Sequence, residues 1–426
     1  MQNWTESGLR HVGLMPATRR GWEVPEIFKE RVAELFALAD AELAQPVRGV
    51  TTDGTVQPGL FGNTATTKAK VSTGEIRNAA LAFAATLDPA VRAKLYLPFD
   101  SPDWRTWINV HMDFFRHGVT LSDLDNRGRA RALGLVRATL SPRGFAQLRD
   151  VMRLNELLVV LGGSTEEFGE WLYNVSFFGD PAGDAPWGWQ LDGHHLAVNC
   201  VVAGDEITIT PAFMGSEPVR VTAEDAVAVR RGQFLTADIS RFVGIEVFGP
   251  EEQAGADLIG SLSADQREQA IAFPSLMPDQ LPEHYQHWYN GRVQGGPLCD
   301  NLVLPYQGLR GADLTAAQRT ALTQAMAVYL GWARSEHASV RLDQAVEHLD
   351  DTWFTWFGGT GPQDPFYYRI HSPVVLIEFD HHKGVVFDNV VPTRNHIHTL
   401  VRTPNGGDYG VDLLARHYAA AHQHPL

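Results

Sequence analysis

The most distinctive chemical pattern in the chain is a pair of histidines near its C-terminal end. His396 and His398 lie two positions apart in a run whose neighbours favour a β-strand. Alternate residues of a strand point to the same face, so both imidazoles should leave one side of the sheet close together. Two imidazoles on one face predict a divalent metal site. A solvated strand edge with two incidental histidines is the alternative interpretation.

A carboxylate in an apolar run is the next candidate ligand. Glu378 lies inside the run 374–379, where an unpaired carboxylate is costly to bury. We therefore expect a cationic partner, which is a metal ion, Arg369, Arg394 or His398. An ordinary buried salt bridge explains the position equally well. Arg369 and Arg394 are also candidates to hold an anionic group of a substrate.

Two adjacent histidines open another apolar strand, in the run 193–196. Adjacent strand residues point to opposite faces, so at most one of them faces the site. His195 shares the face of Asn199, whereas His194 shares the face of the apolar Val198. Both are candidate metal ligands, and His194 is alternatively a core histidine bonded to a backbone carbonyl.

Loop and aromatic residues complete the candidate site. Glu217 follows a predicted strand and a glycine turn, which makes it a candidate general base, with a surface acid as the alternative. The candidate substrate-binding residues are aromatic or polar groups near these motifs: Trp187, Trp189, Arg105, Asn199 and Tyr368. Core packing is the alternative for the aromatic residues, and an exposed salt bridge is the alternative for Arg105. The histidines at 381 and 382 are expected to lie in a solvated turn, outside the site.

The chain also contains an internal similarity. Residues 177–200 match residues 356–379 at a constant offset of 179, each reading as an aromatic pair, a Gly/Pro/Asp loop, an aromatic cluster and an apolar strand. With nine extra residues in the second copy, Thr208 and Thr210 fall opposite His396 and His398. This pattern indicates a duplicated scaffold with one working site. Chance convergence of two similar loops is the alternative.

The periodicity of apolar residues changes along the chain. It predicts a helix from about Glu26 to Ala44, mostly helix between 72 and 160, with a start at Ser141-Pro142, and mostly strand from 177 to 247. The same order then repeats and ends in a short helix at 411–421. We predict an α+β fold of internally duplicated helical-then-β units, with two small antiparallel sheets, flanked by helices, facing a shared central cavity. The expected parts are 1–62 (helix and crossing segment), 63–249, the connection 250–305, and 306–426.

Composition limits the class of protein. The formal net charge of −15 argues against nucleic acid as a partner, because phosphate binding needs clustered Lys and Arg. No run approaches the roughly 20 apolar residues that span a bilayer, and the start of the chain lacks a signal-peptide pattern, so we expect a cytoplasmic protein without a membrane partner. The two cysteines are expected to be reduced.

Several spaced motifs resemble one known family. The runs that carry the resemblance are PDWRTWIN (102–109), LSPRGF (140–145), PWGWQLDGHHL (186–196), EP (217–218), YRI (368–370), LIE (376–378), HIHT (396–399) and DYG (408–410). Together they resemble the bacterial and fungal domain-of-unknown-function family numbered 3500, over nearly the whole chain from about Gly62. Ser372 stands where a glycine is expected. The resemblance implies a shared scaffold and no particular reaction.

These patterns favour one function over three competing interpretations. We expect a metal-dependent enzyme, a hydrolase or lyase that acts on a small oxygenated molecule, with Zn²⁺ favoured over iron or copper. Two histidines with one carboxylate also suit an iron or copper oxidoreductase that uses dioxygen. The chain would equally suit a non-catalytic ligand-binding protein, or metal-free acid–base catalysis by Glu378 with the histidines. The sequence leaves the oligomeric state open.

Overall fold

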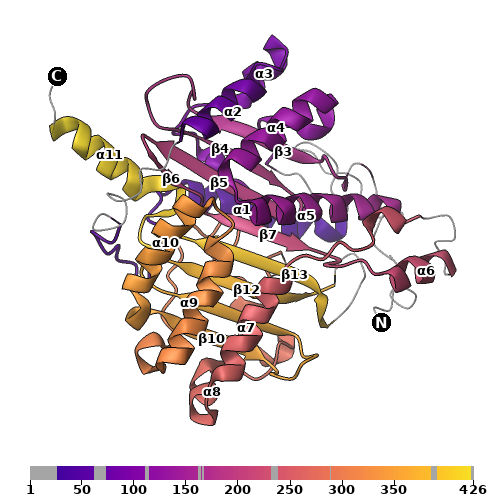
Figure 1. Cartoon of the computed structure of the whole chain (residues 1–426), viewed down its shortest axis with the longest axis vertical. Helices are drawn as coiled ribbons and strands as arrows, with labels where there is room; N and C mark the ends of the chain where they lie inside the picture. The colour runs from indigo at the N-terminus through magenta and orange to yellow at the C-terminus, as the bar shows by residue number, and fades with distance from the viewer. Residues whose placement is uncertain are drawn as a thin grey trace.

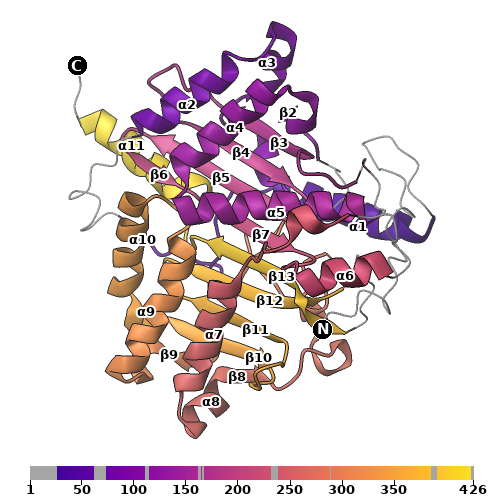
Figure 2. The same ribbon diagram turned by 45° about the vertical axis from the view of Figure 1, so that its right-hand side comes forward.

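One large mixed β-sheet runs through the protein, and most helices pack on one side of it (Figures 1 and 2). The computed structural model describes residues 26–61, 73–110, 115–161, 165, 167–231, 238–287, 289–384 and 391–423. The first 25 residues of the predicted N-terminal part lie outside the described residues. Among the described helices, none combines the length and apolar composition needed to cross a membrane.

The first part of the chain, up to residue 216, supplies one half of the sheet. Its helices are α1 (Glu26–Leu43), α2 (Gly74–Ala84), α3 (Pro89–Leu95), α4 (Asn126–Thr139), α5 (Pro142–Val160) and, just beyond it, α6 (Ala223–Arg231). Its strands are β1 (Tyr96–Leu97), β2 (Val119–Thr120), β3 (Tyr173–Phe178), β4 (Trp187–Gly193), β5 (Leu196–Ala203), β6 (Glu206–Thr208) and β7 (Ala212–Ser216). The predicted helix starts near Glu26 and at Ser141-Pro142 are confirmed. The Ser141 hydroxyl accepts a hydrogen bond from the Gly144 amide and so caps α5.

The second part follows from residue 249 onward. Its helices are α7 (Gly249–Ser261), α8 (Ala264–Ala270), α9 (Ala316–Leu330), α10 (Ser335–Glu347) and α11 (Val411–Gln423). Its strands are β8 (Ile271–Phe273), β9 (Leu309–Arg310), β10 (Trp353–Gly358), β11 (Phe366–His371), β12 (Leu376–Lys383) and β13 (Pro392–Arg402). The segment 250–305, predicted as a connection, thus contains most of α7, all of α8, and strand β8, which pairs with β10.

The described strands form a single sheet in the order β1-β3-β4-β5-β7-β13-β12-β11-β10-β8. Strands β7 and β13 pair antiparallel, with Ser216 opposite Ile397. This pairing corrects the prediction of two small sheets that face a cavity, because the two sets of strands are joined edge to edge. The α+β class itself is confirmed, with helices and strands mixed along the chain.

The strands on either side of this junction have the same order and register. β1 lies parallel beside β3, and β8 lies parallel beside β10. Phe177 pairs with Trp189 in the first part, and Trp356 pairs with Tyr368 in the second, at the offset of 179. For the strands that follow β5 and β12, the observed pairing differs from the alignment predicted from the sequence.

The correction concerns which threonine corresponds to which histidine. Val201 lies opposite Thr208, and Asp380, 179 positions later, lies opposite His398. The register therefore matches Thr208 with His398, where the sequence comparison matches Thr210. The offset between the two runs is therefore two residues larger here than predicted, and a shift of two keeps every side chain on its face.

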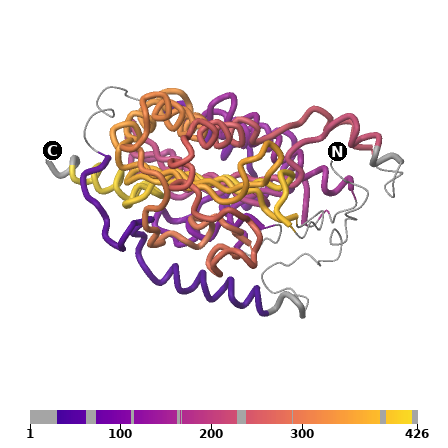
Figure 3. The backbone as a smooth tube through the Cα atoms, turned by 90° about the horizontal axis from the view of Figure 1, so that it is seen from below, coloured from indigo at the N-terminus to yellow at the C-terminus, as the bar shows by residue number. Residues whose placement is uncertain are grey.

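The two faces of the sheet differ in chemistry. One face is apolar and packs against helices α2, α4, α5, α7, α9 and α10 in a large core. The other face carries polar side chains from neighbouring strands, including Gln190 with Asn199, Arg369 with Glu378, and the residues Asp380 and His398. Figure 3 shows α1 on the side of the sheet away from the orange helices. The candidate chemistry therefore gathers on the face opposite the helical layer.

Candidate metal centre

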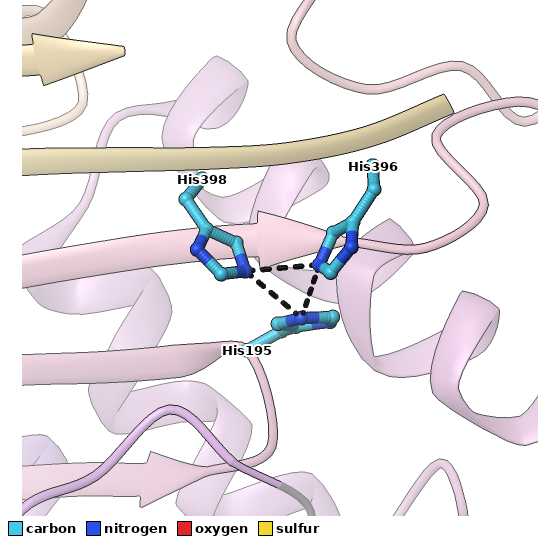
Figure 4. Close-up of side chains that lie close together, drawn as sticks. All are labelled: His195, His396 and His398. Atoms are coloured by element: carbon cyan, nitrogen blue, oxygen red, sulfur yellow. Dashed lines mark hydrogen bonds between the residues drawn. The ribbon is translucent and has the colours of Figure 1, made fainter. Parts of the chain in front are cut away.

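Three histidines meet where the two parts of the sheet join (Figure 4). His396 and His398 project from the same face of β13, as their spacing predicts. His195 lies in the turn between β4 and β5, where its backbone adopts φ of 60°. Its amide donates to the Asn109 carbonyl (3.0 Å), and its carbonyl accepts from the Gly215 amide (2.7 Å). These two contacts hold the turn against the central strands.

The ring nitrogens converge on one point. The Nε2 atoms lie 2.9 Å apart for His396 and His398, 3.1 Å for His396 and His195, and 3.3 Å for His398 and His195. A circle through these nitrogens has a radius of about 1.8 Å, so an ion about 1 Å above their plane meets the usual Zn–N distance of roughly 2.0–2.1 Å. The triangle has the size that one metal ion requires of three imidazoles.

A glycine makes room for this approach. Gly215 pairs with His398 across β7 and β13. A Cβ atom at Gly215 would lie 2.9 Å from His398 Cδ2 and 3.2 Å from His195 Cδ2. Both distances are shorter than ordinary carbon–carbon contacts, so a side chain here would push the two rings apart. Sequence reasoning placed Gly215 only in a turn, and its role depends on the long-range pairing of β7 with β13.

A hydrogen bond on the side of the ring away from the cluster orients His396. Its Nδ1 lies 2.7 Å from the Lys383 carbonyl, which can only accept, so Nδ1 carries the hydrogen. In the neutral ring Nε2 then has a free lone pair directed at the other two histidines. Glu217 Oε2 lies 3.4 Å from the same Nδ1. The predicted general base is therefore beside the nitrogen that faces away from the cluster.

Burial keeps two histidines of the cluster, His195 and His398, in the uncharged form. The pKa of His195 falls well below its usual value because the ring is buried and lies beside His194, His396 and His398. Burial and the neighbouring imidazoles lower the pKa of His398 in the same way. Neutral imidazole is the form that binds a metal ion, so no proton has to leave these two rings near neutral pH.

A further histidine borders the cluster and was not predicted. His382 lies on β12, buried, and its ring stacks on His398 at 4.8 Å between centroids. Its Nδ1 is 3.5 Å from Asp380 Oδ2, and Asp380 pairs with Arg292 at 2.6 Å. The prediction of a solvated turn for 381 and 382 is wrong, because β12 continues through both residues and they are buried.

Glu378 is buried on the same face, but apart from the three histidines. It accepts hydrogen bonds from the Gln294 amide (2.8 Å), the Gly295 amide (2.8 Å) and the Tyr367 hydroxyl (2.6 Å). Burial raises the pKa of Glu378. Arg369 lies opposite it on β11, yet within the described residues no cationic side chain comes within 4.0 Å of the carboxylate. Hydrogen-bond donors thus contact the carboxylate directly, and the predicted partner Arg369 lowers its pKa from beyond contact distance.

The other predicted ligand and the two arginines make separate contacts. His194 Nδ1 lies 2.8 Å from Asn155 Oδ1, while its ring stacks on His195 at 4.0 Å between centroids. Arg369 is buried and donates to Gln307 Oε1 at 3.2 Å. Arg394 pairs with Glu252 at 2.7 Å and is partly exposed. The structure brings none of these three groups into the triangle of nitrogens.

The predicted substrate-binding residues already have partners in the fold. Trp187 and Trp189 belong to the apolar core beneath the helices. Tyr368 donates to the Glu251 carbonyl, on the same helix-covered face. Asn199 donates to the Pro211 carbonyl and accepts from Gln190. Arg105 pairs with Asp300 at 2.8 Å and also donates to backbone carbonyls.

The fold and this cluster define an α+β protein with one mixed sheet and a buried group of three histidines, drawn from both parts of the sheet, that could hold a metal ion. The chain belongs to the family described as "Protein of unknown function (DUF3500)", which it matches over residues 69–411. No curated protein and no solved structure is significantly similar to it. Family membership therefore agrees with the resemblance seen in the motifs and assigns no reaction.

Proposed function

We propose that His195, His396 and His398 bind one divalent metal ion and that the protein is a metal-dependent enzyme, a hydrolase or lyase of small oxygenated molecules. The observation that carries the proposal is the triangle of Nε2 atoms with sides of 2.9, 3.1 and 3.3 Å. At this separation, unprotonated ring nitrogens of three buried imidazoles repel one another through their lone pairs unless a proton or a cation lies between them.

Zn²⁺ is the metal we favour. Three protein ligands with an open position are typical of catalytic zinc, which supplies an activated water or polarises a carbonyl. Among the described residues the cluster contains no carboxylate, so it differs from the two-histidine, one-carboxylate set of iron oxygenases. In this proposal Lys383 and Glu217 orient His396, and Arg369 remains the candidate to hold an anionic part of the substrate.

We further propose that the two parts of the sheet arose by duplication. The matching strand order, the parallel outer strands and the common offset of 179 support a shared origin. Only the second copy carries the two histidines on its last strand, and the first copy contributes the single His195 from a turn. One metal centre in a duplicated body is consistent with a specialised second copy.

Elemental analysis tests the metal site directly. Protein purified without a histidine tag, then dialysed against excess Zn²⁺ and against buffer, should retain about one metal ion per chain. His396→Ala and His398→Ala should each lower this content at least tenfold. His371→Ala is the matched control, because it removes a buried histidine from β11, two strands away from β13. Wild-type protein that retains no metal after loading would contradict the proposal.

Activity assays then separate the enzyme classes. The hydrolase or lyase proposal predicts turnover under argon by the Zn²⁺-loaded protein in a screen of small esters, lactones and hydroxy acids. Turnover that requires dioxygen and bound iron or copper would instead establish an oxidoreductase. Retention of a ligand without turnover, unchanged in His396→Ala, would establish a binding protein.

A further inference from the structure

A cavity of about 100 Å³ lies on the other side of the sheet from the histidine cluster. Its floor includes Val198, Ala212, Met214 and Val401, whose side chains leave β5, β7 and β13 towards the helices. Helices α9, α10 and α11 supply other walls. A cavity of roughly 150 Å³ is large enough to hold benzene, so this space fits a molecule of a few heavy atoms.

One face of α10 gives the cavity its polar character. His337, Val340, Arg341 and Gln344 follow the spacing i, i+3, i+4 and i+7 and all line the cavity. The Arg341 guanidinium donates to three neutral acceptors: Gln344 Oε1 (2.6 Å), the Val374 carbonyl (2.8 Å) and Thr403 Oγ1 (3.0 Å). Hydrogen bonds therefore hold the side chain in place without neutralising its charge.

Arg341 lacks a counter-ion at contact distance. Across the described part of the chain, no carboxylate lies within 4.0 Å of its nitrogens, and burial lowers its pKa to about 10. The guanidinium stays protonated near neutral pH, so the cavity wall carries a full positive charge. The Asp408 carboxylate acts on this partly buried guanidinium only from beyond contact distance, so an anion in the cavity would stabilise the charge further.

His337 provides a second, independent sign of a missing partner. The side chain is 6% exposed, and its Nε2 atom is buried without any hydrogen-bond partner in the described structure. It lies one helical turn before Arg341 on the same cavity wall. Buried polar atoms in folded proteins are nearly always bonded, which points to a group that the cavity receives.

The other charged residues that line the cavity form ion pairs with one another and are partly exposed to solvent. Arg416 pairs with Asp412 at 2.8 Å and with Glu206 at 3.0 Å, and all three side chains are between 26% and 38% exposed. These groups are screened by water and already paired. Arg341 is thus the cavity charge that a ligand can match.

We propose that this cavity binds a small monocarboxylate with a short apolar chain, of about three to five carbon atoms. The carboxylate faces Arg341 and His337, and the chain packs against Met214, Val401 and Val198. The ligand would touch strands β7 and β13 from behind, on the face opposite the histidine cluster. The proposal does not depend on the identity of the metal or on any reaction at that cluster.

Binding of butyrate to the full-length protein, followed by isothermal titration calorimetry, tests this inference. Butyramide has nearly the same shape without the charge, so we expect it to bind wild-type protein at least tenfold more weakly than butyrate. The methyl signal of Met214, assigned through Met214→Leu, should shift on addition of butyrate. Failure of butyrate to bind, or equal affinity for butyrate and butyramide, would overturn the proposal, and neither result requires a variant.

Two arginine variants locate the charge. Arg341→Gln should weaken butyrate binding at least tenfold and leave the weak binding of butyramide unchanged. Arg129→Gln is the matched control, because Arg129 also donates to backbone carbonyls but lies on α4, away from the cavity. Equal loss of butyrate affinity in both variants would contradict a role of Arg341.

Discussion

At the scale of single residues, the chemistry of this protein depends on which nitrogen of each imidazole is free. The Lys383 carbonyl fixes the hydrogen of His396 on Nδ1, and Glu217 lies beside the same atom. A histidine held from behind by a carbonyl or a carboxylate is the usual arrangement of metal ligands. The Lys383 carbonyl and Glu217 therefore distinguish His396 as a candidate metal ligand, which the His-x-His pattern alone does not do.

The role of Glu217 can be tested by an isosteric change. Glu217→Gln keeps the size of the side chain and removes the charge that stabilises a polarised His396. We expect the affinity for Zn²⁺ to fall by about 10- to 100-fold, with little change in folding. Competition with a fluorescent chelator measures the affinity, and Glu206→Gln, at the partly exposed Arg416 pair, is the control. An unchanged affinity for Zn²⁺ would show that Glu217 does not contribute to metal binding.

The buried histidines also make stability depend on pH. Burial lowers the pKa of His337 and of His382 to about 4, below the value of about 6.5 for an exposed histidine. As the pH falls, the unfolded chain takes up these protons first. The stability that the neutral rings contribute is therefore complete above pH 6.5 and is lost as the pH falls towards 4.

We expect the metal-free protein to lose about 1.4 kcal/mol of unfolding free energy per pH unit for each such histidine between pH 6 and 5. Urea denaturation in the presence of a chelator, at pH 7, 6 and 5, measures the slope. Carboxylates with lowered pKa, such as Glu252 and Asp380, change this slope little, because the unfolded chain takes up their protons only near pH 4.5 and 3.8. A flat profile between pH 6.5 and 5 would contradict the assignment of neutral buried rings.

At the scale of elements, the centre depends on one strand pair. β7 supplies Gly215 opposite His398, and the same glycine amide bonds to the His195 carbonyl. The pair β7 and β13 thus sets the separation of all three rings, and a change in β7 should alter the site without touching a ligand.

Gly215→Ala tests this dependence. The added methyl group would lie 2.9 Å from both His398 Cδ2 and the Ile397 carbonyl, so one of them must move. We expect a loss of about 1–3 kcal/mol in unfolding free energy and at least a tenfold loss of Zn²⁺ affinity. Gly134→Ala, in α4 with no atom within 4 Å of the new methyl, should leave Zn²⁺ binding unchanged and the fold slightly more stable. Normal Zn²⁺ affinity in Gly215→Ala would show that β7 does not set the ring separation.

The same strand pair explains what the sequence could predict. Local periodicity and capping residues were sufficient for the helix starts at Glu26 and Ser141 and for the shared face of His396 and His398. The pairing of β7 with β13 was not predictable, because it depends on which strand edges remain open once each set of strands has formed. The hydrogen-bond donors to Glu378 could not be predicted either, because they are the backbone amides of residues 294 and 295 and do not depend on side-chain type.

At the scale of the whole molecule, two similar sets of strands share one sheet and one histidine cluster. The apolar face of that sheet is covered by helices along its length, whereas the polar face carries the histidine cluster together with Arg369, Glu378 and Asp380. A ligand in the cavity behind β7 and a metal ion in front of it would contact the same two strands. Binding of either the cavity ligand or the metal ion at this strand pair should therefore raise the unfolding free energy of the whole chain.

Metal binding should consequently stabilise the protein as one unit. The ligands come from β13 and from the β4–β5 turn, so unfolding either part releases the ion. At a free Zn²⁺ concentration 100 times Kd, the stabilisation is about 2.7 kcal/mol, which for a chain of this length raises Tm by about 3 °C. Differential scanning calorimetry of the metal-free and Zn²⁺-loaded forms measures the shift, and His396→Ala should show none. A shift confined to one of two resolved transitions would contradict a centre shared by both parts of the sheet.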